Sequence, residues 1–61
     1  MTDFFRVALS AAIQDAADEF GAGDPGVRTA QTLFAEGNVL LEAGDYLGAM
    51  NKYKESAQAL P

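Results

Sequence analysis

The stretch that decides the fold is residues 30–61, which read AQTLFAEGNVLLEAGDYLGAMNKYKESAQALP. Apolar residues recur in it at steps of three and four, the period of a helix with one buried face. Gly44 and Asp45 interrupt this pattern, and Asp45 is a favourable N-cap for a further helix. Because so short a connection forces the flanking helices to lie antiparallel, the stretch predicts a helical hairpin.

One glycine stands inside the first helix of this hairpin. Gly37 lies in mid-helix, where glycine is less favourable than alanine by about 1 kcal/mol. We expect the close approach of another helix backbone to offset this cost.

The hairpin resembles the tetratricopeptide repeat (TPR), a helix–turn–helix unit of about 34 residues, through a set of spaced residues: Gly37, Gly44, Asp45, Tyr46, Ala49, Tyr53 and Pro61. The resemblance implies that Gly37 packs against Ala49 and that Tyr53 fills the space between the helices. The final proline would end the second helix. The chain departs from the TPR pattern at Leu33, where an aromatic residue is common, and at Glu36, where a leucine is usual.

TPR proteins usually hold ligand peptides along the inner face of the first helix of the repeat. Mapped onto this chain, that partner-binding face consists of Gln31, Phe34, Asn38, Leu41 and Glu42. The pair Gly37-Asn38 is similar to that of co-chaperone TPR domains that clamp a C-terminal carboxylate. Those domains carry a lysine where this chain has Phe34, so the resemblance implies an apolar contact centred on Phe34 instead.

The whole chain, residues 1–61, predicts a single small all-α domain in which an N-terminal helix precedes the hairpin. We expect helices at about residues 3–20, 25–43 and 46–60. Thr2 is a suitable N-cap for the first helix, and Asp3 suits its first turn. Gly21 is a natural stop for that helix, and Asp24-Pro25 predicts the N-cap and first residue of the second.

Two helical faces are expected to line the core. The face of the first helix comprises Phe5, Leu9, Ala12, Ile13, Ala16 and Phe20. The inner side of the third helix comprises Ala49, Met50, Tyr53, Ser56, Ala57 and Leu60. On the water-facing side of the third helix, Lys52 and Glu55 are expected to pair at i, i+3.

The first helix is apolar over more of its surface than one neighbouring helix needs. Phe4 and Phe5 are adjacent, so on a helix they point about 100° apart. Phe4 therefore either belongs to a wide face that both other helices cover, or it is a partner-binding residue that covers a neighbouring chain.

Composition narrows the possible functions. A domain of 61 residues buries only about 60% of its unfolded surface, which favours association with other chains. The absence of cysteine and histidine removes disulfides and the usual zinc ligands, and we expect no cofactor and no catalytic residue. A net charge of −5 disfavours nucleic acid and membrane surfaces as partners. The first residues lack the basic region of a signal peptide, which predicts a cytoplasmic protein.

Four acidic residues gather near the end of the first helix: Asp15, Asp18, Glu19 and Asp24. Three interpretations remain open, namely a solvated helix end, an acidic patch that faces a partner, and a site for a hard cation. The spacing lacks the rhythm of a calcium-binding loop, so no metal site is assigned.

These observations predict a non-enzymatic protein–protein interaction module or accessory subunit, whose partner is a protein or a second copy of the chain. A homo-oligomer is expected because a single TPR-like unit cannot bury its hydrophobic face alone. One alternative is a structural protomer that polymerises into a filament or shell. Another is an acidic cation-binding protein.

Overall fold

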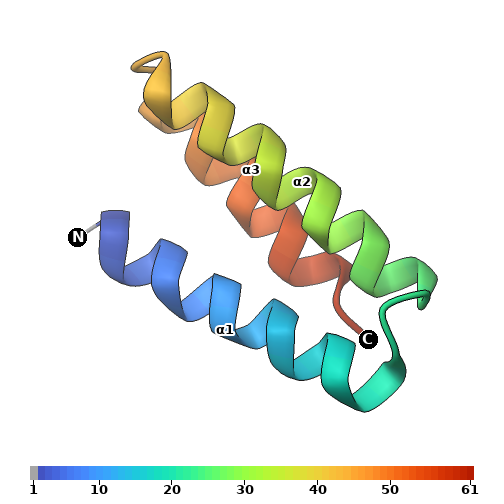
Figure 1. Cartoon of the computed structure of the whole chain (residues 1–61). Coiled ribbons are helices and arrows are strands. Elements are labelled where there is room, and N and C mark those ends of the chain that lie inside the picture. Colours follow the sequence, from blue (N-terminus) through green and yellow to red (C-terminus); the bar gives the residue numbers. More distant parts are fainter. Residues whose placement is uncertain (1) are drawn as a thin grey trace.

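The computed structural model describes residues 2–61, with side chains from Phe4 onward. It contains α1 (Thr2–Phe20), α2 (Pro25–Glu42) and α3 (Tyr46–Ala59), and no strand occurs among these residues (Figure 1). The predicted all-α, three-helix arrangement is confirmed. The roles expected for the side chains of Thr2 and Asp3 lie outside the described residues.

Local chemistry explains where the helices begin and end. Gly21 follows α1 with a φ of 96°, a left-handed conformation that glycine adopts without steric cost. The carboxylate of Asp24 accepts a 3.1 Å hydrogen bond from the Val27 amide and so caps α2. Asp45 caps α3 in the same way, through a 2.9 Å bond from the Gly48 amide.

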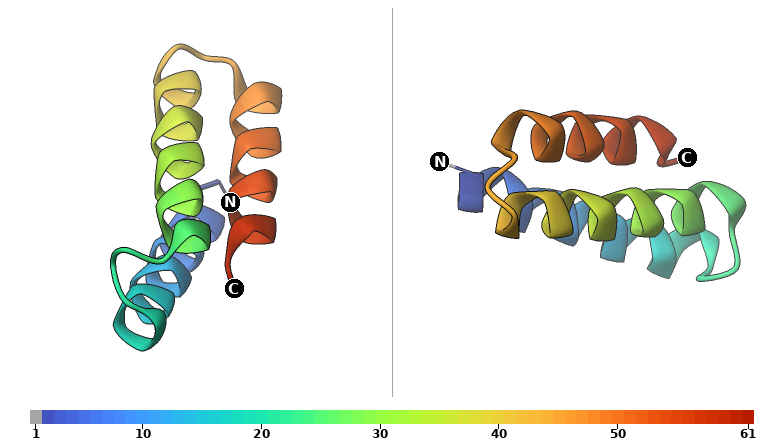
Figure 2. Two further views of the ribbon diagram at one scale, coloured as in Figure 1. Left: turned by 90° about the vertical axis from the view of Figure 1, so that its right-hand side faces the viewer. Right: turned by 90° about the horizontal axis from the view of Figure 1, so that it is seen from above.

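The three helices lie roughly along one direction. α2 and α3 run antiparallel and side by side, and α1 lies against this hairpin, parallel to α3 (Figures 1 and 2). The contact between α2 and α3 is much more extensive than the contact of α1 with either of them. The hairpin is therefore the main structural unit, and α1 is a cover on one side of it.

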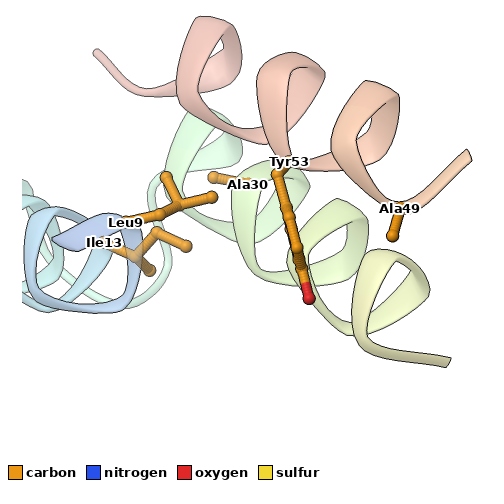
Figure 3. Packing of buried hydrophobic residues seen from close by; sticks show 5 residues of the cluster. All are labelled: Leu9, Ile13, Ala30, Ala49 and Tyr53. Atoms are coloured by element: carbon orange, nitrogen blue, oxygen red, sulfur yellow. The ribbon is translucent and has the colours of Figure 1, made fainter. Parts of the chain in front are cut away.

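One hydrophobic core joins α1 to the hairpin. Its buried members are Leu9, Ile13, Ala30, Ala49 and Tyr53. Figure 3 shows Leu9 and Ile13 reaching from α1 toward Ala30 and Tyr53. The Tyr53 ring is fully buried, with its centroid 6.3 Å from that of Phe5 and 5.5 Å from that of Phe34. This ring therefore contacts aromatic side chains of both other helices.

Several side chains expected in the core are exposed, and those expectations were wrong. Met50 is 37% exposed and Ala57 is also exposed, because α2 covers only the side of α3 that carries Ala49, Tyr53 and Ser56. On α1, Ala12 is exposed, Phe20 is 50% exposed and Phe5 is 38% exposed. The limited contact of α1 with the hairpin leaves these positions uncovered.

Candidate protein-interaction site

The predicted helix-packing residues Gly37, Ala49 and Tyr53 meet at the α2–α3 interface. A Cβ placed on Gly37 would lie 2.5 Å from Cε1 and 2.7 Å from Cδ1 of Tyr53, and 3.3 Å from the carbonyl oxygen of Ala49. The nearest neighbour is thus an aromatic ring, with the α3 backbone slightly farther away. Glycine is needed here because any side chain would displace a buried ring.

Two hydrogen bonds connect the hairpin helices across the same interface. The Tyr53 hydroxyl donates to Oδ1 of Asn38 over 2.5 Å. The hydroxyl of Ser56, which is fully buried, donates to the carbonyl oxygen of Ala30 over 2.6 Å. Both polar side chains are therefore satisfied inside the hairpin, as buried polar groups require.

Gly26 forms a second close contact between helices, which was not predicted from the sequence. A Cβ on Gly26 would lie 2.7 Å from the carbonyl oxygen of Ala59 and 3.4 Å from Cδ of Pro61. The start of α2 thus packs directly on the end of α3. The sequence does contain a signal for this contact, since the spacing of Gly26, Ala30 and Gly37 places three small residues on one face of the helix.

The predicted partner-binding face of α2 is largely engaged within the chain. Phe34 and Leu41 are half-buried and pack against the core, and Asn38 accepts the Tyr53 hydroxyl bond. Gln31 is exposed. Within the single chain, Gln31 and Glu42 are therefore the exposed members of this face.

The outer face of α1 is apolar and exposed. Phe4 is 81% exposed and Val7 is 66% exposed. Ala8 and Ala11 are exposed as well, and the four positions recur at the three- and four-residue steps of one helix face. We call these four residues the α1 outer stripe. By helix periodicity these four positions point away from Leu9 and Ile13. Figure 3 shows that Leu9 and Ile13 face the hairpin.

A second exposed apolar group lies at the start of α3. Leu47 is 76% exposed, and Tyr46 and Met50 are partly uncovered beside it. We call Tyr46, Leu47 and Met50 the α3 patch. It belongs to a different helix from the α1 outer stripe, so the chain presents two separate apolar surfaces.

A shallow hollow of about 330 Å³ lies between α2 and α3, lined by Glu36, Val39, Leu40 and Lys52. Lys52 was expected to pair with Glu55. Its Nζ instead lies 3.2 Å from Oε1 of Glu36, across the hairpin. Because both side chains are substantially exposed, the pair contributes about 1 kcal/mol or less.

The acidic residues near the end of α1 do not form a cation site. The Asp24 carboxylate caps α2, and the Asp18 carboxylate accepts a 3.1 Å hydrogen bond from the side-chain amide of Gln14. Within residues 4–61, no group of three or more acidic side chains is arranged to hold a metal ion. The geometry gives cation binding no support.

None of the helices described, α1 to α3, combines the length and the hydropathy needed to cross a membrane. Comparison with protein-family models, curated proteins and solved structures finds no match to this chain.

Proposed function

We propose that this chain is a non-enzymatic, cytoplasmic protein-interaction module with a TPR-like hairpin, and that it self-associates. The observation that carries the proposal is the exposure of large apolar side chains on two helices, above all Phe4, Val7 and Leu47. Contiguous exposed apolar surface on a small protein is characteristic of association sites.

Within its own chain, α1 buries only part of its apolar surface. The buried apolar residues of α1 are Leu9, Ile13 and Ala16, whereas its outer stripe contributes nothing to the core of its own chain. Complete burial of one large apolar side chain is worth about 1.5–3 kcal/mol. For a chain of 61 residues with a net stability of a few kcal/mol, covering two or three such side chains changes stability substantially.

The TPR resemblance supports the same conclusion. In repeat proteins each hairpin is covered by neighbouring hairpins on two sides, and terminal units carry polar caps. Here α1 covers one side of the hairpin, while the α3 patch is left uncovered. A second copy or a larger protein supplies the missing cover.

A structural protomer that polymerises is the second candidate, favoured by the location of the two apolar surfaces on different helices. When one surface of a copy binds the other surface of the next, the contact is heterologous and repeats in a chain unless rotation closes it into a ring. A discrete oligomer supports the interaction module, whereas growth with concentration supports the polymer.

Sedimentation velocity over a wide range of protein concentration tests self-association directly. We expect a mass above that of the 6.4 kDa monomer, rising with concentration. Binding of a hydrophobic dye to the diluted protein, and its loss on association, is the matching signal. A heat-resistant monomer at every concentration, binding no dye, contradicts the proposal.

A further inference from the structure

We propose that the α1 outer stripe of one copy docks against the α3 patch of a second copy, with the two helices parallel. This inference rests on the proposed self-association and names the surfaces that carry it. The observation behind it is that α1 from Ala8 to Asp15 and α3 from Leu47 to Lys54 show the same order of exposed residues along the helix, with opposite charge and opposite side-chain size.

α1 and α3 carry the same order of exposed residues. Along α1, exposed Ala8 and Ala11 are followed four residues later by exposed Asp15. Along α3, exposed Leu47 and Met50 are followed four residues later by exposed Lys54. Each set lies on one helix face and extends over two turns, about 10 Å.

The two sets of residues are complementary in side-chain size and in charge. When the helices are parallel and in register, Ala8 lies beside Leu47 and Ala11 lies beside Met50. Each large side chain then meets a small one, which permits close packing of the helices. At the same level along the helices, Asp15 meets Lys54. Among the described residues, neither of these charged side chains forms an ion pair or side-chain hydrogen bond within its own chain.

Other pairings of these helices lack this complementarity. A parallel pair of α1 helices places Asp15 beside its own copy, and like charges repel. An antiparallel pair of α1 helices places Asp15 among apolar side chains. An antiparallel α1–α3 pair brings Lys54 to Ala8 and Asp15 to Leu47, which leaves both charges without a partner. Among these α1–α1 and α1–α3 arrangements, the parallel α1–α3 contact alone matches apolar with apolar and acid with base.

Exchange of the two charges tests the contact. Asp15→Lys and Lys54→Asp should each weaken self-association about three- to tenfold, measured by sedimentation equilibrium, because each places like charges together. An equimolar mixture of the two variants should recover the wild-type dissociation constant, since every α1–α3 contact between the unlike copies is again between opposite charges. Recovery in a mixture also shows that both variants are folded.

The matched control is Glu55→Lys. It makes the same charge change as Asp15→Lys, but on α3 and on a different side of that helix from Leu47, Met50 and Lys54. Both variants reduce the net charge from −5 to −3, since replacing an acid by a lysine adds two charges. Reduced repulsion between copies should leave association of the control unchanged or slightly stronger. Weaker association of Asp15→Lys therefore has the opposite sign from the effect of net charge.

The outcomes separate this inference from the proposed function. A wild-type chain that is monomeric at all concentrations overturns both. A wild-type chain that associates, with Asp15→Lys equal to Glu55→Lys and no recovery in the mixture, overturns only the α1–α3 contact. That result directs attention to the hollow at Val39 and Leu40 as the associating surface.

Discussion

The hydroxyl of Tyr53 donates a 2.5 Å hydrogen bond to Oδ1 of Asn38, while the Tyr53 ring occupies the space that a Cβ on the neighbouring Gly37 would need. Tyr53 of α3 therefore contacts α2 at two adjacent positions, by packing of its ring at Gly37 and by a hydrogen bond to Asn38. The same ring also contacts Phe5 and Phe34, so it connects α1 to the hairpin. Most changes near Tyr53 should therefore affect the stability of the whole domain.

Replacing Gly37 by alanine should destabilise the domain despite the better helix propensity of alanine. The new Cβ would lie 2.5 Å from the Tyr53 ring, which is fully buried and cannot move freely. We expect a loss of about 1–3 kcal/mol, and unfolding for Gly37→Leu, measured by thermal melts followed by circular dichroism. Gly23→Ala is the control, because a Cβ there meets no atom within 4 Å. Equal melting temperatures for the two alanine variants would remove the main support for the close packing of α2 and α3.

Tyr53→Phe isolates the polar half of the same contact. The variant keeps the ring against Gly37 and removes only the hydrogen bond to Asn38. We expect a loss of about 0.5–1.5 kcal/mol in the free energy of unfolding. A double-mutant cycle with Asn38→Ala checks the assignment, because the second substitution should cost little once the hydroxyl is gone. Fully additive losses would mean that the two side chains do not interact.

Ser56→Ala should destabilise the open end of the hairpin. The Ser56 hydroxyl is buried and bonded to the carbonyl oxygen of Ala30, so its removal should cost about 1 kcal/mol. Ser10→Ala, on the exposed side of α1, should be neutral or slightly stabilising because alanine is the better helix former. Chemical denaturation of both variants gives the comparison, and a neutral Ser56→Ala would contradict a structural role for the bond.

Phe4→Ser should lower association without lowering helix content. The side chain is 81% exposed in the single chain, so its loss removes little intramolecular packing. Burial of a phenylalanine at a contact is worth about 1.5–3 kcal/mol, which corresponds to a dissociation constant raised roughly ten- to a hundredfold. Phe20→Ser, at the other end of α1, removes an equal side chain outside the outer stripe and serves as the control. Parallel loss of helix content and mass in Phe4→Ser would show that Phe4 belongs to the core.

The arrangement of three helices could be predicted from the sequence because the residues that begin and end helices act locally. Gly21, Asp24 and Asp45 act within one helical turn, and the hairpin follows from a connection too short for any other topology. It placed Met50 and Phe20 incorrectly because periodicity shows that a face is apolar but not how much of it a neighbour covers. Phe4 was weighed as an interface residue and that role stays a prediction, whereas the exposed α3 patch was not recognised from the sequence.

The sequence by itself determined the helices, their ends and their pairing into a hairpin, since each depends on residues within about one turn of one another. Only the tertiary structure decided what those helices cover. The pairing of Ser56 with Ala30 joins residues 26 positions apart, and Gly26 meets Ala59 only when the hairpin has closed. Such contacts depend on how close two helices approach and on their relative rotation, which are set by the packing of all side chains at the interface together.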